Sequence, residues 1–432
     1  MTTPYRTTPH LTTPHRTDEI PVERRAGEPD PAAVAFVLRL ARALHVHGHS
    51  APRLEDVLGA VSDRLGLVGH RFFSTPTSIM AAFGPEARQR AHLLRVEPGE
   101  VNLGKLAELE RLSADVATGR VSPDQGTAEI ARIDAAPSAY GPGLVTLAHG
   151  VLSGAVCQFL GGGGREIAAA AALGLGLGLF SREAGRHARV GRVFEPLAAF
   201  LVSASAMGLA WAAGPLSLFV TTLAGLIVLM PGLTLTTAIS ELATRNLASA
   251  TARMSGAFMT LLGIVFGVAL GTRLGTALFG APVPVAPPGT PGWVGLATLP
   301  LAPLASVAIL RAAPRDAPWI VAAGILGVAG GRLGASSLGV ELGTFAGAFV
   351  VALASSAYER WRRRPAAVVL VPGILMLVPG SVGYRSLSSF LERRTLAGIE
   401  TAFSMILTAV ALAAGLLIAG VLAPESKIEE TR

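Results

Sequence analysis

Cysteine is almost absent from this chain, because only one of its 432 residues, Cys157, carries a thiol. A single cysteine excludes an intrachain disulfide and any zinc site built from several thiolates. Charged residues are also scarce, at 15%, whereas hydrophobic residues make up 51% and the mean hydropathy is +0.52. Soluble domains carry about 25% charged residues, so this composition excludes an ordinary soluble protein and indicates a membrane protein.

Motifs of the common catalytic classes are missing as well. The sequence contains no GxSxG, HExxH or Walker A pattern, and the glycines at 161–164 lack the Lys-Ser/Thr of a phosphate cradle, so we interpret them as a turn. The histidines of HVHGHS at 45–50 suggest a metal site, but no cysteine lies near them and Gly48 interrupts the helix. Glu55 and Asp56 beside them would suit a hydrolytic site, yet no motif supports one. We therefore predict no catalytic residue, no metal and no cofactor.

The net charge of +7 and the pI near 10.4 raise nucleic acid as a partner. The arginines, however, gather in short segments between apolar runs, as in the cytoplasmic loops of membrane proteins. We therefore expect no nucleic acid. The first thirty residues contain no apolar core of a signal peptide, so we expect the N-terminus to stay in the cytoplasm.

The first 137 residues are predicted to form a tail and a small domain. Residues 1–30 repeat TTP units and have little to bury, which is typical of a disordered tail. Residues 31–137 are expected to form a cytoplasmic α+β domain. Its helices are expected at Pro31 to Gly48, at 51–67 with Ser50 as the cap, at Leu103–Ala117 and at Pro123–Asp134. Its strands are expected at Phe72–Phe83 and Ala91–Val96.

The remainder is predicted to be a polytopic α-helical membrane protein, because about ten apolar runs are long enough to cross ~30 Å of hydrocarbon. Two five-helix halves, 138–275 and 292–423, flank a Pro-rich extracytoplasmic loop at 276–291, and a cytoplasmic tail at 424–432 follows. The expected spans are 143–160, 166–180, 194–213, 215–231, 254–274, 292–310, 317–333, 338–357, 366–380 and 396–422.

The positions of the arginines predict the orientation in the cytoplasmic (inner) membrane of the cell. Arginines are dense at 181–192, 245–253, 311–316 and 359–365, and these segments alternate with loops that hold fewer basic residues. Because basic loops stay on the cytoplasmic side, both termini are predicted to be cytoplasmic.

The two halves share a short internal repeat. AGLIVLMPG at 224–232 has a near-copy, PGILMLVPG, at 372–380. Each copy ends in a Pro-Gly step, at Pro231 and Gly232 and again at Pro379 and Gly380, where a lost backbone donor should break a helix. Interrupted hydrophobic segments at matching positions of two halves point to a transporter binding site. Since each half has an odd number of spans, the second is predicted to be inverted, with amphipathic helices after the two breaks on opposite sides.

Hydroxyl-bearing residues surround both breaks and are our candidates for binding and gating. Freed backbone groups and helix N-termini there would suit the amine and carboxylate of a small zwitterion. The alternative is that Pro-Gly merely ends a span, and for Glu241 that it lies on a solvated helix face. The candidates are Pro231, Gly232, Thr234, Thr237, Ser240 and Glu241 in the first copy, and Pro372, Gly373, Pro379, Gly380, Ser381 and Tyr384 in the second.

Ionisable residues in or near spans are costly and are often functional. Arg332 and Glu341 bracket a polar segment and are expected to pair with substrate, with each other, or to carry a proton. Arg165, Glu166 and Arg273 have a simpler alternative, which is that they reach the membrane interface.

Three segments together resemble the threonine/serine exporter family over residues 31–422. They are HGHSAPRLED at 47–56, through Gly48, Ser50, Arg53 and Glu55, then LMPGLTLTTAISEL at 229–242 and VPGILMLVPGS at 371–381. The resemblance implies a secondary transporter in the lipid bilayer that exports L-threonine and L-serine, driven by the proton motive force. It also implies a hydrolase-like N-terminal domain, although no catalytic constellation is visible there.

Three alternatives stay open. Two-component relatives of this family are associated with dicarboxylate export, so a succinate-like substrate is one. A membrane-anchored hydrolase is a second and belongs to a different class, although an anchor would not need two matched broken helices. A sensor role for the N-terminal domain is a third and is compatible with export. The sequence predicts no oligomeric state.

Overall fold

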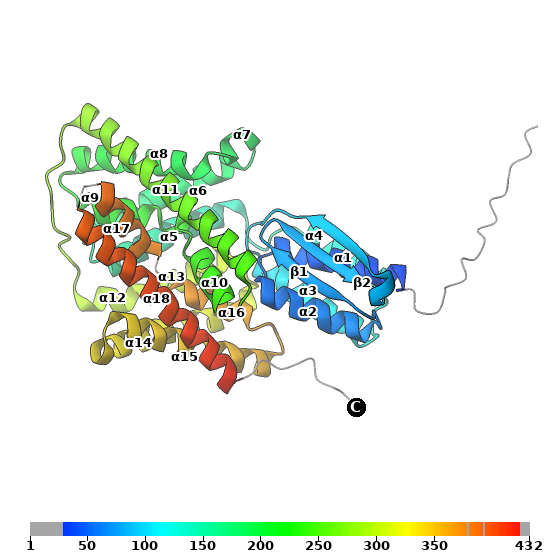
Figure 1. Ribbon diagram of the computed structural model, residues 1–432. Coiled ribbons are helices and arrows are strands. Elements are labelled where there is room, and N and C mark those ends of the chain that lie inside the picture. The colour runs from blue at the N-terminus through cyan, green and yellow to red at the C-terminus, as the bar shows by residue number, and fades with distance from the viewer. Residues whose placement is uncertain (1–28, 378–379, 392–393, 424–432) are drawn as a thin grey trace, which may run out of the picture.

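The computed structural model describes residues 29–377, 380–391 and 394–423, so most of the predicted disordered tail and the segment 424–432 lie outside it. The chain forms an N-terminal domain beside a larger helical body (Figure 1). We call the side of the body that this domain covers the N-domain side, and the opposite side the far side.

The N-terminal domain packs helices against a small antiparallel sheet. Its elements are α1 (Pro31–Val46), α2 (Ala51–Arg64), β1 (Arg71–Thr75), β2 (Ser78–Phe83), the 3-10 turn η1 (Glu86–Arg88), β3 (Arg90–Arg95), α3 (Leu103–Ala117) and α4 (Pro123–Ala135). The strand order is β1-β2-β3. Phe36, Leu40 and Leu44 of α1 are fully buried in the core between the helices and the sheet. The four predicted helices are confirmed.

The predicted single strand from Phe72 to Phe83 is wrong, because the chain reverses within it. β1 and β2 form a hairpin in which Thr75 pairs with Ser78. The Ser78 amide donates to the Thr75 hydroxyl oxygen at 3.1 Å, which closes the turn around Pro76 and Thr77. The polar, proline-bearing segment STPTS at 74–78 separates two apolar runs and is a turn signal, which the prediction of a single strand overlooked.

The helical body confirms a membrane protein with many spans. Within the described residues, eight helical segments are long and apolar enough to cross a bilayer, and they match eight of the ten predicted spans. They are α5 (Pro142–Phe159), α6 (Gly164–Ala184), α8 (Phe194–Ala213), α11 (Leu247–Phe279), α12 (Gly292–Thr298) with α13 (Leu301–Ile309), α14 (Ala317–Leu338), α15 (Val340–Arg362) and α18 (Thr395–Leu422). Short elements α7 (Ala188–Gly191) and η3 (Pro314–Asp316) connect some of them.

The predicted continuous spans 215–231 and 366–380 are wrong. The first is α9 (Leu218–Gly225), followed by the 3-10 turn η2 (Ile227–Leu229) and α10 (Gly232–Ala243), with a bend of 55° at the break. The second is α16 (Ala367–Leu375), followed by α17 (Gly380–Leu391). At 1.5 Å per residue, eight or nine residues cover only about 12–14 Å. The first Pro-Gly step therefore lies within a bent pair of helices that together are long and apolar enough for one span. At the second step, Pro379 lies outside the described residues, and Gly380 begins α17.

Hydrogen bonds give the direction of the first broken crossing. The hydroxyl of Tyr140, just before α5, donates to the Ala312 carbonyl on the N-domain side at 2.7 Å. α5 then leads to the far side, where Glu166 at the start of α6 accepts from the Ser217 amide just before α9. Glu241 near the end of α10 accepts from Ala51 of the N-terminal domain at 3.0 Å. α9 and α10 thus run from the far side to the N-domain side.

The second broken crossing runs the other way. α16 begins on the N-domain side, where Val368 packs with Leu103 and Leu106 of α3. α17 reaches the far side, where the ring of Tyr384 lies 5.9 Å from that of Phe219 at the start of α9. Figure 1 shows α10 beside the N-terminal domain and α17 at the opposite end of the body.

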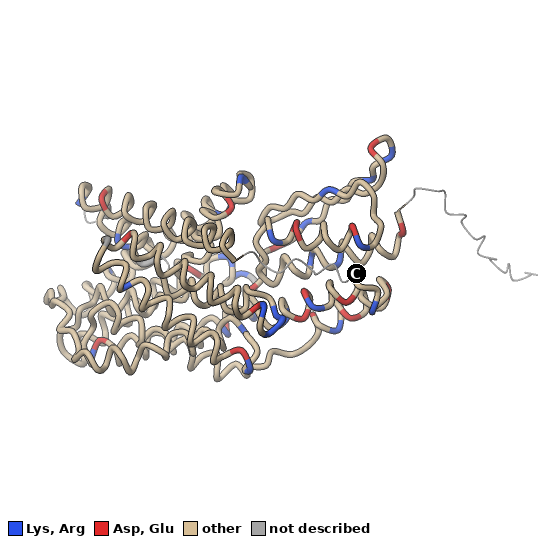
Figure 2. Tube along the Cα trace, turned by 90° about the horizontal axis from the view of Figure 1, so that it is seen from below, with Lys and Arg blue, Asp and Glu red and all other residues tan. Residues whose placement is uncertain are grey.

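Charged residues are concentrated on and near the N-terminal domain. Figure 2 shows blue and red segments over this domain and at its junction with the body, whose other end is mostly tan. Glu241, Arg253, Arg311 and Glu359 all lie at this junction and form ion pairs there. Three of the predicted arginine-bearing segments therefore share the side on which the N-terminal domain sits.

Candidate functional site

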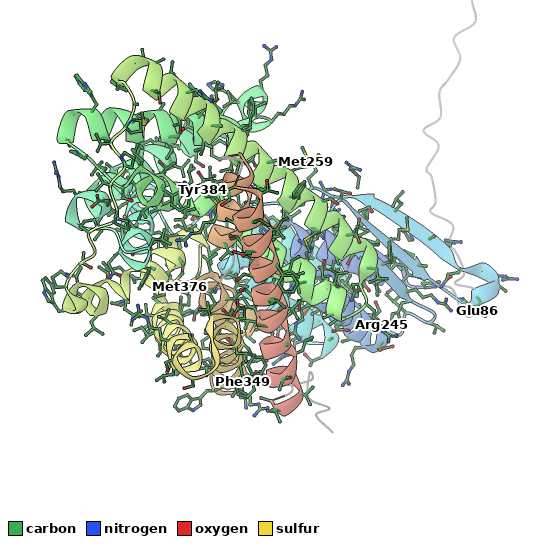
Figure 3. The ribbon with its side chains drawn as sticks, turned by 60° about the vertical axis from the view of Figure 1, so that its left-hand side comes forward. Glu86, Arg245, Met259, Phe349, Met376 and Tyr384 are labelled. Carbon is green, nitrogen blue, oxygen red and sulfur yellow. The ribbon has the colours of Figure 1, made fainter. Side chains whose placement is uncertain are left out.

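The two breaks meet between the first helices of the two halves. Ile227 and Val228 of η2 and Met376 after α16 pack around one cluster. The buried residues of that cluster are Ala148, Leu152 and Ala155 of α5 and Ala302, Ala305 and Ala308 of α13. Small side chains allow membrane helices to approach closely. In Figure 3, Met376 lies inside the helical body, whereas Glu86 marks the outer tip of the N-terminal domain.

Each break brings a helix end and a helix start together within the helical body. α9 and α16 end here and α10 and α17 begin here, and an α-helix leaves its last carbonyl groups and its first N–H groups without partners inside the helix. Part of this capacity is used in the turns, since the Gly232 amide donates to the Met230 carbonyl oxygen at 2.8 Å. These ends carry partial charges of about −0.5 and +0.5. The arrangement offers a cation site and an anion site at each break, which suits a small zwitterion.

Buried hydroxyls flank the first break, and they differ from those that the sequence indicated. Thr221 of α9 and Thr236 of α10 are 0% and 2% exposed, and within the described chain neither hydroxyl oxygen has a hydrogen-bond partner. The predicted Thr234, Thr237 and Ser240 are half-buried. Thr236 lies within the segment 229–242 that the sequence singled out, whereas Thr221 was missed, because the apolar run around it is typical of an uninterrupted span.

The second break is close-packed. Pro372 lies inside α16, and a Cβ on the buried Gly373 would lie 2.5 Å from a methyl group of Val351, so only glycine fits there. Pro379 lies outside the described residues, and Gly380 and Ser381 begin α17. Tyr384 is 3% exposed against α9.

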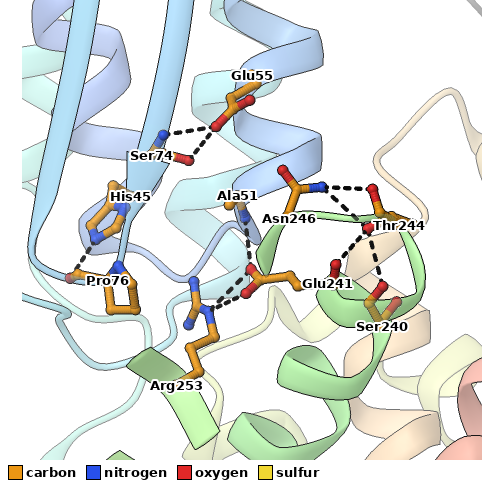
Figure 4. A network of polar contacts seen from close by, with 10 residues as sticks. All are labelled: His45, Ala51, Glu55, Ser74, Pro76, Ser240, Glu241, Thr244, Asn246 and Arg253. Atoms are coloured by element: carbon orange, nitrogen blue, oxygen red, sulfur yellow. Dashed lines mark hydrogen bonds and ion pairs between the residues drawn. The ribbon is translucent and has the colours of Figure 1, made fainter. Parts of the chain in front are cut away.

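Glu241 is buried between three elements, which excludes the solvated-face alternative. Its exposed fraction is 1%, and both of its carboxylate oxygens lie 3.1 Å from Arg253 Nε on α11. Oε1 also accepts a hydrogen bond from the Ala51 amide, at the start of α2 (Figure 4). Ser50 occupies the N-cap position of α2 as predicted, but its side chain makes no capping hydrogen bond, and the amide of the first helical residue, Ala51, is bound by Glu241.

The other predicted residues of the N-terminal motif lie next to this contact. Gly48 ends α1 at φ 104°, in the left-handed region that glycine adopts without strain. Arg53 lies 3.7 Å from Glu110 of α3 and 3.7 Å from Glu359 of α15. Glu55 accepts hydrogen bonds from the amide and hydroxyl of Ser74, and its burial raises its pKa.

The histidines of the HVHGHS segment have separate partners. His45 Nε2 lies 3.0 Å from the Pro76 carbonyl oxygen, His47 Nε2 lies 2.9 Å from Asp134, and His49 Nε2 lies 2.8 Å from Glu110. Burial lowers the pKa of His45, so this side chain is held neutral. Across the described residues no group of three potential ligands could hold a metal ion.

The ionisable residues in or near spans have different surroundings. Glu166 is 3% exposed and accepts from the amides of Gly163 and Ser217, so it joins the starts of α6 and α9. Arg165 donates to the Ala213 carbonyl. Arg273 is exposed, and so is Arg332, which does not pair with Glu341. Glu341 instead accepts from Ser404 of α18 at 3.1 Å.

One clear asymmetry distinguishes the two halves. In the first half α6 packs on α5, and a Cβ on Gly150 would lie 2.6 Å from Leu175. In the second half the corresponding α14 packs on α15, and a Cβ on Gly343 would lie 2.6 Å from the Gly331 carbonyl oxygen. Between α6 and α8 lies a groove of about 570 Å³ lined mainly by apolar and small residues, including Gly176.

Two family models of known proteins together match nearly all of the N-terminal domain and the helical body. Residues 35–275 match the family described as "Putative threonine/serine exporter", and residues 298–422 match "Threonine/Serine exporter, ThrE". Pheromone-regulated membrane protein 10 of Debaryomyces hansenii is 25% identical over 85% of this chain and 37% of its own length. The protein of the same name in Candida albicans is 27% identical over 81% of this chain and 33% of its own length. A Mycobacterium tuberculosis protein named "Probable threonine/serine exporter" is 27% identical over 76% of this chain and 64% of its own length.

The chain therefore spans between about a quarter and a half of the length of the fungal relatives that it matches. No solved structure matches the chain with significance.

Proposed function

The chain belongs to the threonine/serine exporter family, and from this premise we propose that it is a secondary transporter that exports L-threonine and L-serine by alternating access. The observation that carries the proposal is the meeting of two broken helices of opposite direction at one place between the halves. Broken helices near the midplane, at the interface of two repeats, are the usual site of substrate in such transporters.

The contacts inside each half support an inverted repeat of five crossings. α8 packs on α11 as α15 packs on α18, α10 packs on α11 as α17 packs on α18, and α6 meets α9 as α14 meets α16. On this reading residues 138–275 and 292–423 are the two halves, joined by 276–291. The N-terminal domain then lies in the cytoplasm, with both termini, and the lipid bilayer is the inner membrane.

The asymmetry of the halves supports alternation. The two halves share one arrangement but differ in one helix contact. Each half therefore shows a conformation that the other half could adopt. If each half adopted the arrangement of the other, α6 would move from α5 onto α8 and close the groove. In the second half, α14 would move from α15 onto α13. The substrate site would then open to the other side.

Substrate chemistry follows from the first break. Helix ends hold the charged groups of an amino acid, and Thr221 and Thr236 provide hydroxyls that can bind a substrate hydroxyl. Protons are the proposed coupling ion, and Glu341 is the proposed carrier. We assign no chemistry to the N-terminal domain, because His47 and His49 are each engaged by a carboxylate.

Counterflow in proteoliposomes tests the proposal. Labelled threonine, serine and succinate are offered separately to vesicles that are preloaded with the same unlabelled compound. We expect uptake of threonine and serine, loss of uptake in Thr236→Val, and normal uptake in Thr272→Val, which changes an exposed threonine of α11 in the same way. Uptake of succinate alone, or of none of the three, would contradict it.

A further inference from the structure

The N-terminal domain is anchored on the second half of the body. Leu103, Leu106 and Ala107 of α3 pack in one cluster with residues of α13, α14, α15 and α16, namely Val307, Ile320, Tyr358 and Val368. The amides of Leu103 and Gly104 donate to the Leu310 and Arg311 carbonyl oxygens at 3.0 and 3.1 Å. The backbone hydrogen bonds to the chain just after α13 are a firm attachment, so the domain should move with α13 of this half.

The same domain reaches the first half through the first turn of α2. The Ala51 amide donates to Glu241 of α10, and Arg253 of α11 holds that carboxylate from the other side. Two residues later, Arg53 lies against Glu359 of the second half. One turn of helix therefore touches both halves at the N-domain side.

The chemistry of this contact makes it stronger than a neutral hydrogen bond. The start of a helix carries about +0.5 of a charge, and a carboxylate placed there is stabilised. Glu241 is almost completely buried, so water does not compete for it. Hydrogen bonds of this charged kind change an equilibrium by roughly 10- to 150-fold.

We propose that the first turn of α2 is a latch that keeps the N-domain side of the transporter closed. Glu241 is its positioning residue: it ties α10, the second part of the first broken helix, to a domain that is attached to the second half. Opening of this side requires the Ala51–Glu241 hydrogen bond to break. The latch rests on the proposed function, since a protein that does not alternate would need no such release.

The test measures how accessible α10 is to a thiol reagent. Ala238 of α10 is fully buried, so Ala238→Cys in a Cys157→Ala background reports any movement of this helix. Labelling is followed in open membrane fragments, so both sides are reachable. We expect slow labelling in the background protein and labelling faster by roughly 10- to 150-fold in Glu241→Ala.

Two further variants separate the latch from a purely structural ion pair. Ala51→Pro removes the donor without changing Glu241 or Arg253, and proline suits the first position of a helix, so it should also label fast. The exchange Glu241→Arg with Arg253→Glu keeps the ion pair but places a cation at the start of α2, so it should label as fast as Glu241→Ala.

The outcomes are distinct. Slow labelling in Ala51→Pro, or slow labelling restored by the exchange, would overturn the latch. Glu183→Gln is the control, because it removes an exposed carboxylate paired with Arg186 on the same side and should leave labelling unchanged. Thermal unfolding of each variant shows that it is folded. Because labelling uses no substrate, its result stays informative even if counterflow shows a different substrate or none.

Discussion

Filling the groove between α6 and α8 should block transport without damaging the fold. Gly176 lines this groove, and a Cβ built on it has no heavy atom within 4 Å. Gly176→Leu should therefore be accommodated in the present conformation. In the proposed alternate conformation, α6 lies on α8 as α14 lies on α15, where glycines bring the two backbones close together. A leucine there would force the helices apart.

The expected magnitude follows from packing alone. In a bilayer the leucine gains no hydrophobic free energy by entering the groove, since lipid tails are as apolar as the groove walls. Helix propensity improves by about 1 kcal/mol on replacing glycine, but equally in both conformations, so it cancels. What remains is the cost of overpacking, about 1–3 kcal/mol, which lowers the population of the alternate conformation by roughly 5- to 150-fold.

Counterflow of threonine in proteoliposomes measures this effect, and thermal unfolding in detergent checks the fold. Gly256→Leu is the matched control, because this glycine of α11 is also helical and has open space around it, but lies outside the groove. We expect counterflow to fall at least fivefold in Gly176→Leu and to stay normal in the control. A stable Gly176→Leu protein with a wild-type rate would refute the exchange of helix contacts.

Three further predictions concern stability. Gly174→Ala should lower the free energy of unfolding by about 1–3 kcal/mol, since its Cβ would lie 2.7 Å from the His149 carbonyl oxygen. Gly176→Ala should leave the free energy of unfolding unchanged, and thermal melts of the two variants test the difference. Glu166→Ala should cost about 1–3 kcal/mol, because two buried amides lose their acceptor, and an unchanged melting temperature would contradict the bridging role. Burial alone would raise the pKa of Glu110, but its bonds to His49 and Arg53 outweigh burial and hold the pKa below the usual 4.5. The stability that this carboxylate contributes is therefore present above pH 4.5 and is lost as the pH falls. If acidification lowers the melting temperature of Glu110→Gln as much as that of the unchanged protein, the loss belongs to other groups.

The latch and the groove would act on the same event from two sides. The latch holds the end of α10 on the N-domain side, and the groove leaves room for α6, which contacts α9 of the same broken helix. Release of α10 and closure of the groove should therefore occur together. Ala51→Pro should increase the fraction of the alternate conformation, whereas Gly176→Leu should decrease it, and the two changes should offset each other in one protein.

Local signals were sufficient to predict most of the elements. The helix at Leu103–Ala117 was predicted at its observed bounds, and in the structure Asn102 caps its start. Eight spans followed from the length of apolar runs, and the two breaks followed from Pro-Gly, which removes a donor wherever it stands. Such properties belong to a few neighbouring residues, so they are readable without knowledge of the fold.

Other features depended on partners far along the chain, and only the tertiary structure decided them. Glu241 has the same spacing on its helix whether it faces water or a helix start 190 residues away. Thr236 and Thr237 are equally good hydroxyls in the sequence, and packing alone buries the first. The start of α9 is joined to the start of α6 by the bond from Ser217 to Glu166, a contact between residues 51 positions apart that the sequence does not show. Composition and periodicity thus determined which segments enter the membrane and where they break, whereas burial and long-range charge pairing decided which side chains meet there.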